Sequence, residues 1–123
     1  MTMTQQEAMD QGDELNRRIK GLFDEAELRG GKILASGMGY EETIQHEDGR
    51  YLKTGKWLVK ATVGWKTWLR GEKFADFILL DPEEVPTNEG QRDKLLEVLQ
   101  FQMDNSMAKI VAMTEEEFKH RHD

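Results

Sequence analysis

Three tryptophans lie within a short cationic run, and this part of the sequence is best suited to binding chemistry. Trp57, Trp65 and Trp68 all fall between Arg50 and Lys73. Aromatic rings stack on nucleobases while ammonium and guanidinium groups pair with phosphates, so the combination suits single-stranded nucleic acid. Tryptophan and arginine are also frequent anchors of protein interfaces. The candidate binding residues are Trp65, Trp68, Lys56, Lys60, Lys66, Arg70 and Lys73.

The same residues also have a purely structural interpretation. Tryptophans in a chain with few other large apolar groups most often lie in the core. Lys60 alternates with apolar neighbours, which is typical of the solvated side of a strand. Basic strands can also pair with acidic helices of their own chain or of a second copy. The sequence leaves open whether Trp57, Trp65 and Trp68 are core or surface.

Charge is distributed unevenly along the chain. Residues 50–73 hold seven Lys and Arg residues and one acid, a net charge of +6, although the whole chain carries −7. Overall negative charge opposes the long-range attraction of nucleic acids. An array of carboxylates can instead imitate a phosphate backbone, as in small acidic inhibitors made by phages and mobile elements. The acids that would form such an array are Asp81, Glu83, Glu84, Glu89, Asp93 and Glu97.

The residue types most used in catalysis form no set that spacing recommends. His46 flanks an expected turn, and His120 and His122 form a His-x-His pair, a spacing that can chelate a metal but is weak evidence by itself. Ser36-Gly37-Met38-Gly39 lacks a third glycine and a Walker lysine, so we interpret it as a tight turn between two strands. We therefore expect no enzyme activity, no metal and no cofactor.

Length and composition limit the class of protein. A chain of 123 residues holds one domain with one core. Apolar residues make up 37% and charged residues 33%, and the mean hydropathy of −0.73 indicates a heavily charged surface. The absence of cysteine excludes disulfides and fits a reducing compartment. No apolar run has membrane-spanning length and no signal-peptide pattern is visible, so we expect a cytoplasmic protein without membrane contact.

The first expected element is a helix over residues 5–29. Thr4 and Glu7 have the spacing of a capping box, and Gly30-Gly31 is a natural stop. One apolar stripe follows the helical period: Leu15, Ile19, Leu22, Phe23 and Ala26. Gly12 weakens the front of this helix, so residues 1–12 are a candidate for disorder, as are residues 119–123.

A β region follows. We expect strands over residues 32–38, 40–46, 51–54, 56–64 and 73–80. Asp48-Gly49 predicts a hairpin turn, and residues 65–68 fall in the connection between the last two strands. Strand 73–80 is apolar on both faces, which predicts a central position or cover on both sides. Asp76, in its middle, is then expected to pair with Lys53, Lys56 or Lys60.

The C-terminal third predicts helices. After an acidic loop over residues 81–89, Asn88 and Gln91 can cap a helix over residues 89–105. Its core stripe is Leu95, Leu96, Leu99 and Met103. Residues 107–113 fit either a continuation of this helix or, after a turn at residues 104–106, a short strand, and we favour the strand. Thr114 and Glu117 then predict a final short helix anchored by Phe118.

Together these elements predict a single α+β domain over residues 1–123, in two layers. It contains an N-terminal helix, an antiparallel sheet of four or five strands and a C-terminal helix or helices. We expect a small acidic interaction protein that binds another macromolecule, a protein in the first place, in the manner of phage or mobile-element accessory and inhibitor proteins. The alternative is single-stranded nucleic-acid binding through residues 50–73. A homodimer also fits, because the oppositely charged segments complement each other.

Overall fold

The computed structural model describes residues 2–120. Its elements, in chain order, are α1 (Gln5–Phe23), β1 (Lys32–Gln45), β2 (Tyr51–Leu69), β3 (Glu72–Leu80), the short 3-10 turn η1 (Pro82–Glu84), α2 (Glu89–Ala112) and α3 (Glu115–His120). The strands form an antiparallel sheet in the order β1-β2-β3. The predicted α+β class, with an N-terminal helix and C-terminal helices, is confirmed. The prediction of four or five strands is wrong, because the described residues form a sheet of three.

Two glycines explain the difference in strand number. Gly39, predicted to lie in a tight turn, is part of a continuous β1, where its missing side chain leaves room for the Ala8 carbonyl of α1. Gly55 lies within β2 at a φ of +80°, a value that favours glycine. There, residues 54–56 oppose Glu42 alone, so the strand contains a bulge and continues.

The two hairpin turns differ in how well the sequence predicted them. The turn at Asp48-Gly49 is confirmed: Gly49 has a φ of +89°, and the backbone N–H of His46 donates to the Arg50 carbonyl at 2.7 Å. The predicted connection at residues 65–68 is wrong, because β2 runs on to Leu69. The chain reverses at Arg70 and Gly71, whose φ values of +54° and +80° match a two-residue type I′ turn.

Strand β3 lies at an edge of the sheet and not at its centre. One of its faces is packed against the core and the other is open, which is why both are apolar without a second neighbouring strand. The predicted pairing of Asp76 with Lys53, Lys56 or Lys60 is also wrong. The register places Asp76 opposite Trp65, and the carboxylate is exposed and accepts a hydrogen bond from the backbone of Phe77 at 2.8 Å.

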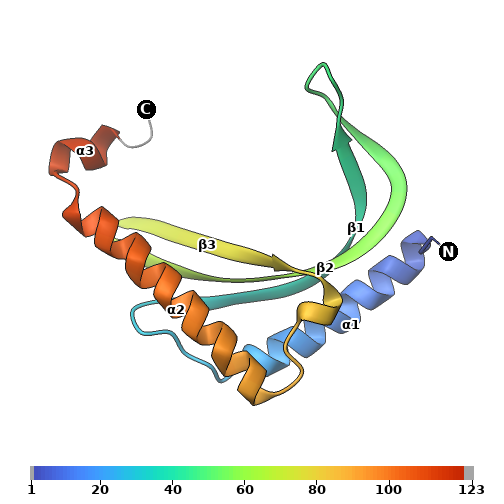
Figure 1. Cartoon of the computed structure of the whole chain (residues 1–123), viewed down its shortest axis with the longest axis horizontal. Helices are drawn as coiled ribbons and strands as arrows, with labels where there is room; N and C mark the ends of the chain where they lie inside the picture. The colour runs from blue at the N-terminus through green and yellow to red at the C-terminus, as the bar shows by residue number, and fades with distance from the viewer. Residues whose placement is uncertain (1, 121–123) are drawn as a thin grey trace.

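The helices α1 and α2 lie on the same side of the sheet (Figure 1). Their buried residues and one face of β2 form the core, which contains Ala8, Leu15, Ile19, Phe23, Val59, Ala61, Val63, Trp65, Leu99 and Met103. Glycines bring α1 close to β1, since a side chain at Gly12 would overlap the Gly39 backbone and one at Gly37 would lie 2.6 Å from the Asn16 nitrogen. This two-layer arrangement positions the residues of the candidate binding surface.

The helix boundaries partly differ from prediction. Helix α1 has its predicted Thr4–Glu7 capping box but ends at Phe23. Residues 24–31 leave the helical path, because Leu28 is buried and the Arg29 backbone exchanges two hydrogen bonds with the Gln100 side chain of α2. Helix α2 begins at the predicted Asn88 cap.

The favoured strand at residues 107–113 is wrong, because α2 continues to Ala112. Residues 104–106 contain no helix breaker, and Met107 packs against the core four residues after Met103. The final short helix is confirmed: Thr114 caps α3, and Phe118 is buried with its ring centroid 6.4 Å from that of Phe74. Met1 and residues 121–123, which include His122 and part of the predicted disorder, lie outside the described residues. Within residues 2–120, no helix is long and apolar enough to cross a membrane.

Candidate binding surface

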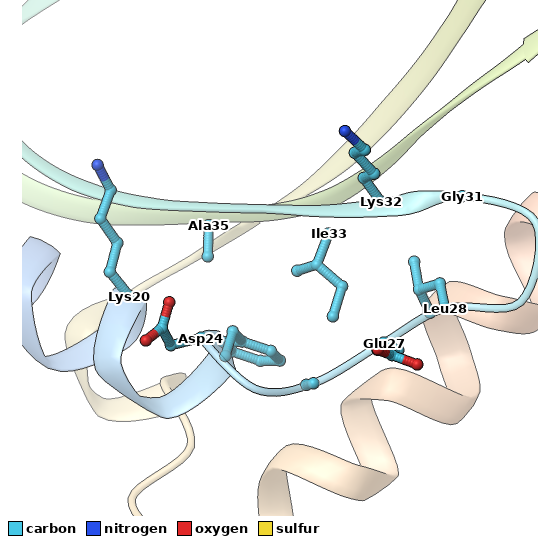
Figure 2. A pocket seen from close by; sticks show the side chains of 10 residues that line it. Lys20, Asp24, Glu27, Leu28, Gly31, Lys32, Ile33 and Ala35 are labelled. Carbon is cyan, nitrogen blue, oxygen red and sulfur yellow. The ribbon is translucent and has the colours of Figure 1, made fainter.

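Side chains alternate between the two faces of the sheet, and only one face is covered by helices. At the start of β1, Ile33 and Ala35 point toward the helices while Lys32 points to the opposite side (Figure 2). In β2 the buried side chains of Val59, Ala61, Val63, Trp65 and Thr67 occupy odd positions, so the even positions face away from the helices. The register extends this assignment to all three strands.

We call the uncovered side the open face. Its residues are Lys32, Leu34, Ser36, Met38 and Tyr40 of β1, then Leu58, Lys60, Thr62, Gly64, Lys66 and Trp68 of β2, and finally Lys73, Ala75, Phe77 and Leu79 of β3. They form cross-strand rows: Lys32 with Lys66 and Ala75, Leu34 with Gly64 and Phe77, Ser36 with Thr62 and Leu79, Met38 with Lys60, Tyr40 with Leu58, and Trp68 with Lys73. The face is therefore a continuous surface built from all three strands.

Large apolar side chains are exposed on this face. The exposed fractions are 67% for Trp68, 58% for Phe77, 54% for Leu79 and 48% for Met38. Phe77 comes so near to Gly64 that its Cβ lies 2.7 Å from the position a Cβ on Gly64 would take. A glycine in the central strand thus makes room for an aromatic residue from the edge strand.

Charge on the open face has one sign. Lys32, Lys60, Lys66 and Lys73 belong to it, and none of its residues is an acid. The Lys60 ammonium lies 4.4 Å from the centroid of the Tyr40 ring, a cation–π contact that holds the charge over the face. The three strands carry four acids: Glu41, Glu72 and Asp76 are in register with helix-side residues of β2, and Glu42 lies at the bulge.

The structure separates the predicted binding residues into four environments. Lys60, Lys66, Trp68 and Lys73 meet on the open face, whereas Trp65 is 2% exposed and belongs to the core. The remaining two are Arg70, in the β2–β3 turn, and Lys56, exposed in the β2 bulge. Only part of the predicted set therefore forms one surface.

Arg70 is used within the chain. Its Nη2 donates to the Met113 carbonyl at 3.3 Å, and its guanidinium carbon lies 4.8 Å from the centroid of the Phe118 ring. Both contacts connect the β2–β3 turn to the C-terminal helix α3. We therefore leave Arg70 out of the candidate surface.

Several members of the open face were not predicted from the sequence. Lys32, Met38 and Tyr40 come from β1, and Phe77 and Leu79 come from β3, so all five lie outside the cationic segment 50–73. Alternation places each on one face of its own strand. Only the pairing register shows that these faces coincide.

A cleft of about 480 Å3 lies on the helix side of the sheet. It is formed by the end of α1, residues 24–28 and the start of β1 (Figure 2). Ile33 and Ala35 point into it, and Lys20, Asp24 and Glu27 surround it. Charges of both signs at its edge select no ligand class. Among residues 2–120, no group of three or more His, Cys, Asp or Glu side chains is placed to hold a metal ion.

No protein-family model, curated protein or solved structure matches this chain. Its class therefore rests on the fold and the surface: a two-layer α+β domain whose antiparallel sheet presents one face to solvent.

Proposed function

We propose that this chain is a small non-enzymatic binding protein that receives another macromolecule on its open face. The supporting observation is that Trp68, Phe77, Leu79 and Met38 are all exposed on one side of the sheet, among lysines of the same face. Large exposed apolar side chains gathered on one side and bordered by charge are a usual mark of an interaction site. Burying one such side chain against a partner contributes about 1.5–3 kcal/mol.

The geometry also favours this face over the helix side. Most apolar sheet residues on the helix side are buried or half-buried against α1 and α2, so they offer less surface for a partner. On the open face, the backbone of three paired strands holds the anchors rigidly, which lowers the ordering entropy lost on binding. The acids of η1 and α2, which suggested mimicry of a phosphate backbone, lie on the other layer and are not needed for this proposal.

The proposal is tested by affinity capture from the source cells with the tagged full chain, followed by identification of bound protein and nucleic acid. Trp68→Ala and Phe77→Ala should each reduce the recovered partner severalfold. The matched control is Phe101→Ala on α2, because Phe101 is also 67% exposed but lies on the other layer. Recovery that is equal for all three variants, with unchanged melting temperatures, would contradict the proposal.

A further inference from the structure

We infer that the macromolecule bound by the open face is a single-stranded nucleic acid, an inference that rests on the proposed function of this face. Three independent observations support it: the sign of the charge, the position of the lysines within the face, and the distribution of aromatic rings over the strands.

The sign of the charge requires an anionic partner. Four lysines and no acid occupy the open face, although the whole chain has a net charge of −7. The helices α1 and α2 are each close to neutral, with four acids and three Lys or Arg residues apiece, so the open face is a local cationic surface on an acidic chain. An approaching polyanion is attracted by this local charge at short range.

The position of the lysines favours nucleic acid over protein. Lys60 and Lys66 belong to the central strand, where they are half-buried among the apolar groups of the face. Lysine is depleted in the centre of protein–protein interfaces, whereas a phosphate backbone needs cations throughout its path. A second copy docking face to face would bring these lysines against each other, which disfavours such a dimer.

The aromatic rings supply positions for bases. Each strand contributes one ring to the face: Tyr40 from β1, Trp68 from β2 and Phe77 from β3. Trp68 pairs with Lys73, so Phe77 lies four residues further along β3, about 13 Å at 3.3 Å per residue. Lys73 lies opposite Trp68, and Lys66 lies opposite Ala75, midway between Lys73 and Phe77 along β3. Rings separated by cations match bases that alternate with phosphates.

The same rings select a single strand over a duplex. Stacking on a side chain requires a base that has left its own stack, and the bases of a duplex have not. Strands β1 and β2 bend away from the helices toward their hairpin, so the open face is a curved surface and not a flat one (Figure 1). A flexible strand can follow such a surface at low cost.

The test is titration of the full chain with a fluorescein-labelled, mixed-sequence DNA single strand of about 16 nucleotides, a length within the range that such sites cover. Binding is followed by fluorescence anisotropy at several salt concentrations. If four lysines each neutralise one phosphate, the slope of log K against log salt should be about −3. Lys66→Gln should make this slope shallower by about 0.7. Lys20→Gln on α1 is the matched control and should leave it unchanged.

Stacking is tested with two substitutions at one position. Trp68→Ala should weaken binding about tenfold or more, and Trp68→Phe should retain most of the affinity because it keeps a ring. Circular dichroism melts of each variant verify that the fold is intact. A duplex of the same sequence should bind more weakly than the single strand, and equal affinity for both would overturn the inference.

Failure of the inference and failure of the proposed function are distinguishable. If the oligonucleotide does not bind at low salt, but capture from cells still depends on Trp68 and Phe77, the nucleic-acid inference is overturned and the proposed function stands with a protein partner. If neither the oligonucleotide nor the captured partner depends on these residues, both are overturned.

Discussion

Trp65 and Trp68 are three residues apart on the same strand and lie on opposite faces of the sheet. The first is 2% exposed and packs in the core, and the second is 67% exposed on the open face. An odd separation along a strand always has this result, because side chains alternate. Two tryptophans that look equivalent in the sequence therefore have different physical roles.

The first prediction concerns the stability of tryptophan variants. Trp65→Ala should lower the free energy of unfolding by about 3–5 kcal/mol, because it leaves a cavity in the core. Trp68→Ala should change it by less than about 0.5 kcal/mol, the usual limit for surface positions. Trp65→Phe is a useful control, since the buried Trp65 indole N–H makes no hydrogen bond that phenylalanine would lose. Urea unfolding measures all three, and similar values for Trp65→Ala and Trp68→Ala would contradict the two environments.

The second prediction concerns tryptophan fluorescence. Acrylamide should quench the wild-type emission in two fractions, an accessible one from Trp68 and a protected one from Trp65. Trp68→Phe should remove most of the accessible fraction and shift the remaining emission to the blue, because the remaining indoles are at least half-buried. A single, fully protected emission in the wild-type chain would place Trp68 in a buried site.

The third prediction compares two glycines of helix α1. A Cβ at Gly12 would overlap the β1 backbone at Gly39, so Gly12→Ala should destabilise the fold by at least about 1–3 kcal/mol. Gly21 has no atom within 4 Å of its would-be Cβ, so Gly21→Ala should stabilise it by about 0.5–1 kcal/mol through helix propensity. Thermal melts followed by circular dichroism should show shifts of opposite sign. If Gly12→Ala also raised the melting temperature, α1 could not approach β1 this closely.

The fourth prediction concerns Arg70, which joins the β2–β3 turn to α3. Arg70→Asn should keep the turn, because asparagine tolerates the positive φ, but it removes both contacts to Met113 and Phe118. Amide hydrogen exchange should then accelerate in Glu115–His120 while β2 and β3 stay protected. Unchanged exchange in α3 would show that the Arg70 contacts contribute nothing to its docking.

Local features of the fold were predictable because each depends on residues close in sequence. The Thr4, Asn88 and Thr114 caps and the Asp48-Gly49 turn all follow from hydrogen bonds or backbone angles within a few positions. The helical stripe of α1 and the alternation in β2 follow from the periods of the helix and the strand.

The errors arose where a distant segment decides the outcome. Gly39 was expected to end a strand, but the approach of Ala8 in α1 makes a glycine suitable within it. By local pattern, residues 107–113 fit either a helix or a strand, and the strand was favoured. In the structure they are part of α2 to Ala112, and Met107 packs against the core. Strand β3 has the apolar pattern of a central strand, yet no strand pairs with its outer edge within residues 2–120.

For the candidate surface, the sequence by itself determined that the cations and tryptophans lie together in one segment. It also predicted, through alternation over residues 56–64, that Lys60 lies on the solvated side of a strand, whereas Lys66 and Trp68 were expected in a connection and lie in β2. Only the tertiary structure decided that helices cover the Trp65 side, and that Lys32, Tyr40 and Phe77 join the other. The physical reason is that alternation fixes two faces for each strand, whereas strand register and helix packing decide which faces combine and which one meets water.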